Sequence, residues 1–183
     1  GFPTANLAVR SRLLKEVDGF DERVEIYGED YDLCARLYAA GAAIVYQPDA
    51  RVAHNHRTTV RGMLRQGFGF GRSHAFLLER HATRGLWIGL PFRSFAWTGF
   101  SGRAWVDLAA ADKKVLAILL LGMGYGPALW LLLPYAGWLV VAARRRARLA
   151  GAAVSLPGAT ALAGLLLLKS GAMTVGRWYG SMR

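Results

Sequence analysis

The chain has 183 residues, of which 54% are hydrophobic and 19% are charged, and it contains one cysteine. This composition excludes a disordered chain, because the hydrophobic content is too high, and a disulfide scaffold, because one cysteine cannot pair within the chain. The net charge of +11 is unevenly spread: residues 1–60 carry 7 basic and 9 acidic side chains, whereas residues 61–183 carry 16 basic and 3 acidic ones. The two parts of the chain are therefore expected to meet different surroundings.

The first sixty residues predict an α/β domain. Residues 11–17 place their apolar side chains on one helical face, and Gly19 follows as a terminating residue. A second helix is expected to begin at the carboxylates of residues 29–32 and to close at Gly41. Residues 43–46 and 51–54 have the composition of short strands. Helices and strands in this order are typical of an α/β arrangement over residues 1–60.

Residues 61–112 predict a basic and aromatic helical segment at a membrane surface. Residues 58–79 can form one long basic helix, although three glycines between residues 67 and 71 argue against a continuous one. Residues 86–106 are rich in Trp and Phe, with Arg93 and Arg103 among them, which is typical of the headgroup interface. Anionic membrane lipid, and no nucleic acid, is the partner expected for the basic residues.

Residues 113–183 predict a transmembrane helical region. Two stretches lack charged residues, 115–143 with 29 residues and 149–168 with 20, and a bilayer core needs about 20 helical residues. Two topologies remain open. Either both stretches cross the membrane and the basic loop 144–148 lies opposite the N-terminal domain, or the first stretch, which Gly and Pro interrupt, folds back as a re-entrant hairpin.

Three groups of residues are candidates for chemistry. Glu29, Asp30 and Asp32 could supply a general base, although carboxylates in a first helical turn are also explained by the helix dipole. His54 and His56 point to one face of an extended segment and could approach one metal ion or one phosphate, or they could be ordinary polar residues at a strand end. The arginines and glycines of residues 61–72 could cradle a diphosphate or form a basic helix on lipid.

These groups, in this order, resemble the C-terminal half of family 2 glycosyltransferases with the GT-A fold. The resemblance is carried by residues 4–10 (TANLAVR), 17–22 (VDGFDE), 28–37 (GEDYDLCARL), 46–50 (YQPDA) and 52–57 (VAHNHR). It implies a membrane-bound, inverting enzyme that transfers a sugar from a nucleotide-sugar donor to a lipid-linked or cell-envelope glycan acceptor. The enzyme would lie at the cell membrane, with its catalytic part facing the cytoplasm, because nucleotide sugars are made in the cytoplasm.

The resemblance also implies roles for single residues. Asp30 would be the catalytic base, Glu29 would orient the acceptor or the base, and Asp32 would cap the following helix. His56 or His54 would help to hold Mg²⁺ or Mn²⁺ on the diphosphate. The residues expected to bind the substrate or its diphosphate are Asn6, Arg57, Arg65, Gln66 and Arg72.

The chain begins at Gly1 without the pattern of a signal peptide. It is therefore expected to be the C-terminal part of a longer protein whose donor-binding half carries a DxD motif, and to be inactive alone. The alternative is a non-catalytic module in which residues 1–60 dock to a partner and the basic segment binds anionic lipid.

Overall fold

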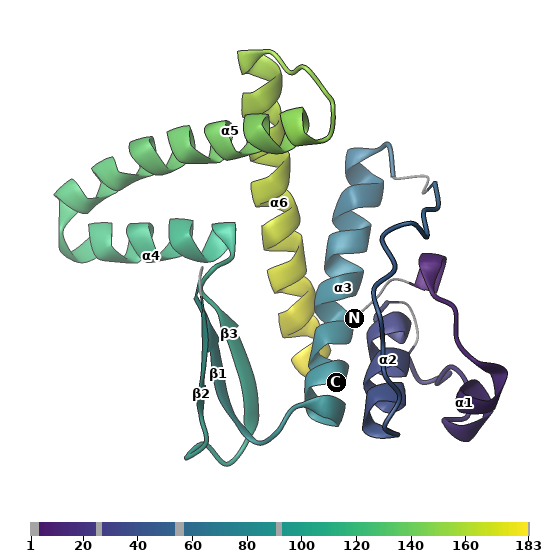
Figure 1. The fold of residues 1–183 in the computed structure, drawn as a ribbon. Helices are drawn as coiled ribbons and strands as arrows, with labels where there is room; N and C mark the ends of the chain where they lie inside the picture. The colour runs from purple at the N-terminus through teal and green to yellow at the C-terminus, as the bar shows by residue number, and fades with distance from the viewer. Residues whose placement is uncertain (1–3, 25–26, 54–56, 91–92, 183) are drawn as a thin grey trace. The chain divides into compact units, whose positions relative to one another are not determined.

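The structure is a computed structural model that describes residues 4–24, 27–53, 57–90 and 93–182. Its elements, shown in Figure 1, follow in the order η1 (Thr4–Asn6), α1 (Ser11–Glu16), α2 (Glu29–Ala39), α3 (Val60–His81), β1 (Gly85–Gly89), β2 (Ser94–Trp97), β3 (Arg103–Asp107), α4 (Ala111–Gly124), η2 (Gly126–Leu131), α5 (Leu132–Leu149) and α6 (Leu156–Ser181). They form two compact units, Gly1–Arg84 with Met173–Arg183, and Gly85–Ala172. This division concerns packing, and the domain boundaries at residues 60 and 112 stay a prediction.

The two short helices of the first unit end where the glycines predict. Gly19 has a φ of 63°, and its N–H donates to the carbonyl of Leu14 at 2.8 Å. Gly41 has a φ of 81°, and the N–H of Ala42 donates to the carbonyl of Leu37 at 3.0 Å. Both are left-handed conformations that glycine adopts without steric cost. The predicted helices at residues 11–17 and 29–40 are thereby confirmed to within a residue or two at each end.

The helix α3 is continuous from Val60 to His81, although glycines were expected to interrupt it. Thr59 caps its first turn, since its side-chain oxygen accepts from the N–H of Gly62 at 3.1 Å. Gly69 and Gly71 are buried, and a Cβ on either would overlap a neighbour: the ring of Tyr27 for Gly69 and the carbonyl oxygen of Met173 on α6 for Gly71. Close packing against these neighbours offsets the low helix propensity of glycine.

The strands predicted at residues 43–46 and 51–54 are wrong over the residues that the structure describes, where neither segment is part of a sheet. A strand needs a neighbouring strand to receive its backbone hydrogen bonds, and no pairing is formed within residues 27–53. Apolar composition alone therefore overstated the strand content of this region.

The sheet of this chain lies instead in residues 85–107, which were expected to be helical. The strand order is β2-β1-β3, with β1 and β2 antiparallel and β1 and β3 parallel. Trp87 and Trp105 are paired in register, and their rings stack with centroids 6.2 Å apart. Aromatic and β-branched side chains favour strands, and cross-strand aromatic pairs stabilise them. The prediction that the segment 61–112 is helical throughout is therefore wrong for residues 85–107, while its place at a membrane surface stays a prediction.

The long charge-free stretch folds back on itself. The helix α4 ends at Gly124, and α5 returns in the opposite direction (Figure 1). The hydroxyl of Tyr135 donates to the carbonyl of Ala111 at 3.3 Å, and Lys114 Nζ lies 5.4 Å from the centroid of the Trp138 ring. The arginines of residues 144–148 belong to the last turns of α5, not to a loop.

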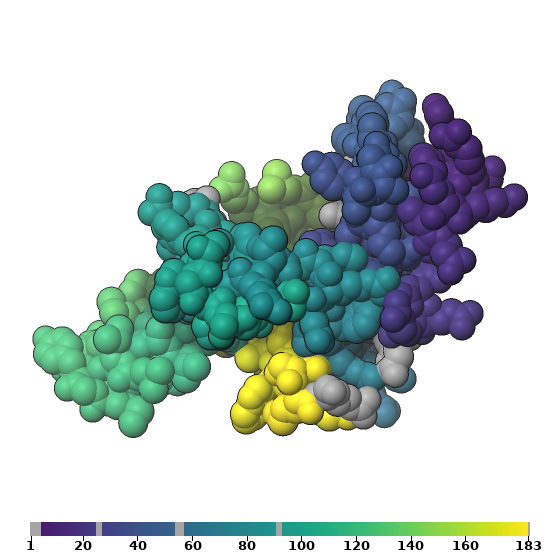
Figure 2. All heavy atoms as spheres, turned by 90° about the horizontal axis from the view of Figure 1, so that it is seen from below, coloured from purple at the N-terminus to yellow at the C-terminus, as the bar shows by residue number. Residues whose placement is uncertain are grey.

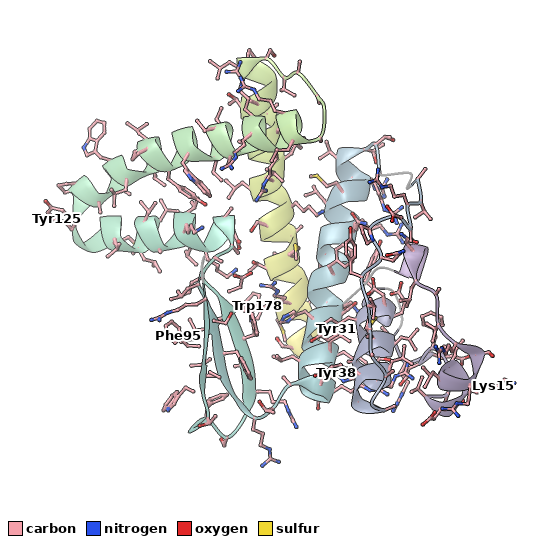
Figure 3. All side chains as sticks on the ribbon, in the orientation of Figure 1. Lys15, Tyr31, Tyr38, Phe95, Tyr125 and Trp178 are labelled. Carbon is pink, nitrogen blue, oxygen red and sulfur yellow. The ribbon has the colours of Figure 1, made fainter. Side chains whose placement is uncertain are left out.

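Two helical segments are long and apolar enough to cross a membrane by length and composition alone, Gly126–Leu149 and Leu156–Ser181. Large apolar side chains around the turn between α4 and α5 are strongly exposed, among them Met123 at 84% and Trp130 at 73%. Atoms of this turn lie at the surface in the space-filling view (Figure 2), and Tyr125 is labelled there in Figure 3. Such a surface is typical of contact with lipid or with another protein.

Candidate active site

Glu29 and Asp30 begin the helix α2, directly after Gly28. Gly28 has a φ of 98°, and a Cβ on it would come 2.7 Å from Leu77 Cδ1 on α3, so only glycine fits this entry to the helix. Both carboxylates are half-buried. Asp30 Oδ1 accepts the backbone N–H of Tyr31 at 2.8 Å. Within the described ranges no cation forms an ion pair with either carboxylate.

Asp32 has a different surrounding and does not cap the helix as expected. Its side chain is fully buried, with no exposed surface. Oδ2 accepts from Arg36 Nε at 2.8 Å, while Oδ1 lies 2.8 Å from His81 Nε2 and 3.3 Å from Arg80 Nε. A buried carboxylate is tolerated only when it is paired and hydrogen-bonded. Asp32 therefore links α2 to the last turn of α3 and does not act as a helix cap.

Two arginines extend this network to the segment between α1 and α2. Arg36 donates from Nη1 to the carbonyl of Val17 at 2.5 Å and from Nη2 to that of Gly19 at 2.8 Å. Arg80 Nη1 donates to Asp21 Oδ2. The hydrogen bonds from Arg23 and Arg80 hold the pKa of the Asp21 carboxyl well below its usual range, and Asp21 in turn raises the pKa of Arg23.

The residues on both sides of Glu29 and Asp30 contact α3. The rings of Tyr27 and Phe70 have centroids 4.8 Å apart, and Gly28 faces Leu77. On the other side, the ring centroid of Tyr31, which is labelled in Figure 3, lies 6.2 Å from that of His81. The pair of carboxylates therefore sits between two anchored positions.

The predicted substrate-binding residues lie in several places of this unit. Arg57 is exposed, and its Nη2 donates to the hydroxyl of Tyr27 at 3.4 Å, which brings it near the start of α2. Arg65 is exposed on α3, whereas Gln66 and Arg72 on the same helix are half-buried. Asn6 is exposed and donates from Nδ2 to the carbonyl of Ala50 at 2.6 Å, so it fastens the loop at residues 47–50. His54 and His56 lie outside the described residues.

The comparison with protein families decides the class. The family model described as glycosyl transferase family group 2 matches residues 1–167. The chain belongs to this family.

Two curated relatives from Mycobacterium tuberculosis are similar to part of this chain. One is a pre-mycofactocin glycosyltransferase, 46% identical over 79 residues, which are 43% of this chain and 17% of the relative. The other is an N-acetylglucosaminyl-diphospho-decaprenol L-rhamnosyltransferase, 37% identical over 94 residues, which are 50% of this chain and 29% of the relative. The chain thus matches less than a third of the length of either relative. No solved structure matches the chain.

The described residues of this chain do not form a metal site by themselves. Among them no group of three His, Cys, Asp or Glu side chains could hold a cation. The carboxylate of Asp32 is already bound to Arg36, Arg80 and His81. Glu29 and Asp30 then offer only two carboxylate groups, fewer than a metal site built by the protein needs. The described residues alone therefore do not supply a complete set of ligands for Mg²⁺ or Mn²⁺.

Sequence reasoning proposed Glu29 and Asp30 as site residues but missed Arg80 and His81, which bind the neighbouring Asp32. The spacing of Asp32 and Arg36 is that of an i, i+4 ion pair and was a readable signal. Arg80 and His81 carried no such signal, because they follow Asp32 by nearly fifty residues and a histidine in a basic helix is usually a surface residue.

Proposed function

We propose that the parent protein is an inverting glycosyltransferase that moves a sugar from a nucleotide-sugar donor to a lipid-linked or cell-envelope glycan acceptor. The observation that carries this proposal is the pair Glu29 and Asp30, half-buried at the start of α2 without a cationic partner in the described residues. A carboxylate held at such a position can act as a general base toward a hydroxyl group. Family membership supports the same class of reaction.

In the proposed mechanism Asp30 accepts the proton of the acceptor hydroxyl. The oxygen forms its bond to the anomeric carbon as the bond from that carbon to the diphosphate breaks, and the nucleoside diphosphate leaves with the electron pair. One displacement inverts the anomeric centre. Glu29 orients the acceptor. Arg57, Arg65, Gln66 and Arg72 are the residues of this chain proposed to meet the substrate or its diphosphate, with Asn6 holding the neighbouring loop.

The requirement for Mg²⁺ or Mn²⁺ is proposed from the family resemblance. His56 or His54 would contribute from this chain, and further ligands would come from outside its described residues. Because Mg²⁺ and Mn²⁺ favour oxygen ligands, most of these further ligands would be carboxylates or water. Loss of turnover in EDTA and its return with Mn²⁺ is the expected result in the full-length protein.

The acceptor class is proposed from two observations. The rhamnosyltransferase relative is named for N-acetylglucosaminyl-diphospho-decaprenol, and this chain has two helical segments apolar enough for a membrane. A site beside the bilayer meets lipid-linked molecules at high local concentration.

We further propose that the catalytic part is cytoplasmic and that the hairpin of α4, η2 and α5 enters and leaves the membrane on that side. Lys113 and Lys114 begin the hairpin and the arginines of residues 144–148 end it, while residues 115–143 between them carry no charge. The contact of Tyr135 with Ala111 supports a hairpin whose two ends lie on the same side of the membrane, each with basic residues. This arrangement obeys the positive-inside rule and favours anionic lipid headgroups.

The test is sugar transfer by the full-length protein in membranes, with a panel of nucleotide sugars and the variant Asp30→Asn. Loss of a general base is expected to lower kcat by about 100-fold or more, with donor affinity within about twofold. Glu16→Gln, an exposed carboxylate of α1, is the matched control and should keep full activity. Donor affinity that falls in parallel with turnover contradicts the assignment of Asp30 as the base.

Absence of turnover with every donor, in folded full-length protein, would favour the non-catalytic membrane module instead. The 183-residue chain alone is expected to lack activity, because the proposed donor-binding half belongs to the longer protein.

A further inference from the structure

We propose that Arg80 and His81, at the end of α3, are positioning residues that fix the first turn of α2 and thereby the direction of the Asp30 carboxylate. The inference rests on the proposed function, in which Asp30 is the base. Neither residue touches the reacting atoms in this proposal. Both act through Asp32, two residues after Asp30 in the same helical turn.

The first argument is the burial of Asp32. Its carboxylate has no exposed surface and uses both oxygens, Oδ2 for Arg36 and Oδ1 for His81 and Arg80. A buried charge that loses a partner is costly, so the side chain holds its position as long as these partners hold theirs. The first turn of α2 is therefore tied to the groups that bind Asp32.

The second argument separates local from long-range partners. Arg36 belongs to α2 itself, four residues after Asp32, so their pair forms wherever α2 lies. His81 is 49 residues from Asp32 in sequence and belongs to another helix. Among the partners of Asp32, only Arg80 and His81 can therefore hold the first turn of α2 against α3. The helix α3 also carries the proposed diphosphate-binding residues Arg65, Gln66 and Arg72.

The third argument is the pattern of contacts around the base. His81 meets Asp32 at 2.8 Å and lies beside the ring of Tyr31, so one imidazole contacts the two residues that directly follow Asp30. Leu77, one turn earlier on α3, packs on Gly28, just before Glu29. The helix α3 thus holds the chain on both sides of the catalytic pair and leaves the pair itself open to a ligand.

Arg80 is expected to matter more than His81. Its guanidinium binds two carboxylates from different segments, Asp32 of α2 and Asp21 of the loop before α2. It therefore fixes α2 relative to the loop as well as to α3, whereas His81 acts on α2 alone.

The experiment compares Arg80→Gln and His81→Gln with Arg84→Gln in the full-length protein. Arg84 is exposed just beyond α3 and gives a matched loss of charge. We expect kcat per folded molecule to fall by about 10- to 100-fold in Arg80→Gln and by less in His81→Gln, because a misplaced catalytic group loses its near-attack geometry. The donor KM should stay within about twofold, and Arg84→Gln should match the parent.

A merely structural role would reduce the amount of folded enzyme and leave kcat per folded molecule unchanged, which would overturn the proposal. So would a rise in donor KM without loss of kcat. If Arg80→Gln does not fold, Arg80→Lys is the second variant. It keeps the positive charge but lacks the planar guanidinium that binds Asp32 and Asp21 together, and it is also expected to lower kcat. A kcat equal to that of the parent in folded Arg80→Lys and His81→Gln would also overturn it.

A double-mutant cycle separates this inference from the proposed function. If Arg80 acts only through Asp30, then Arg80→Gln should change the residual rate of Asp30→Asn by no more than about twofold. Fully multiplicative losses would overturn the positioning role while leaving Asp30 as the base. Full turnover by Asp30→Asn alone would instead overturn the proposed function.

Discussion

The carboxylate of Asp21 accepts hydrogen bonds from Arg80 and Arg23, and these bonds hold its pKa below the ordinary aspartate value. A group whose pKa is lower in the folded than in the unfolded state stabilises the fold at pH values above its unfolded pKa. That stabilisation is lost as the pH falls toward the folded pKa, because the unfolded chain then binds more protons. Asp21 should therefore contribute to acid sensitivity.

We expect Asp21→Asn to lower the Tm of the detergent-solubilised protein at pH 7. The difference in Tm between this variant and the parent, called the gap below, should narrow below about pH 4. Thermal unfolding from pH 7 to pH 3 measures this gap. Asp49→Asn, which removes an exposed carboxylate, should leave Tm close to that of the parent at each pH. A gap for Asp21→Asn that stays constant down to pH 3 would contradict the interpretation.

Residue types and spacing single out Glu29 and Asp30 as candidates because the GED motif is local in sequence, and their catalytic role stays a prediction. The same reasoning placed Asp32 at a helix cap, whereas burial and three cationic or imidazole partners give it a structural role. The difference arises from Arg80 and His81, whose approach depends on tertiary packing. Patterns within one helix cannot reveal such long-range partners.

At the scale of elements, the contact of α3 with the end of α6 is built from glycines on both helices. A Cβ on Gly71 would overlap the carbonyl of Met173, and a Cβ on Gly176 or Gly180 would overlap the carbonyl of Phe68 or Arg72. Backbone approaches backbone directly, and these contacts cannot be relieved by a side-chain rotation. The glycines that argued against a long helix at 58–79 are therefore the reason that the two helices pack.

Gly71→Ala is expected to lower the free energy of unfolding by about 1–3 kcal/mol, because even one methyl group forces the helices apart. The matched control is Gly171→Ala on α6, where an added Cβ meets nothing within 4 Å. This variant has the same gain in helix propensity without the steric overlap. Chemical denaturation of the two variants measures the difference. Equal stability of Gly71→Ala and Gly171→Ala would show that the helices separate at no cost.

The misreading of residues 86–106 has a similar origin. Trp and Phe suit both an interfacial helix and a strand, so composition alone could not tell the two apart and the helical prediction was wrong. Pairing decides it, since Trp87 and Trp105 stack across adjacent strands that are separated by a complete intervening strand in the chain order. The mixture of helices and a sheet was predicted correctly as a class, but the sheet was assigned to the wrong residues.

At the scale of the whole molecule, the two charge-free stretches predicted apolar helices, and two helical segments are long and apolar enough to cross a membrane by length and composition. Sequence reasoning left two topologies open because length alone does not say where a 29-residue apolar stretch bends. The turn at Tyr125 and the contact between Tyr135 and Ala111 favour the folded-back form.

The hairpin proposal predicts labelling from one side of the membrane. In a Cys34→Ala background, Ser101→Cys before α4 and Ala152→Cys after α5 should react with a membrane-impermeant maleimide from the same side. Met123→Cys near the turn should not react with it from either side. Ser101→Cys and Ala152→Cys reacting from opposite sides would mean that the chain crosses the bilayer between them.

The unit that carries Glu29 and Asp30 is discontinuous in the chain, because residues 1–84 are completed by residues 173–183. Gly71 and Met173, which touch through their backbones, are 102 residues apart. During biosynthesis every motif of the candidate active site is therefore made long before the helix segment that packs against α3. The ribosome must finish both arms of the hairpin and nearly all of α6 before this unit can close, so its final folding step follows, and does not precede, the synthesis of the apolar helices.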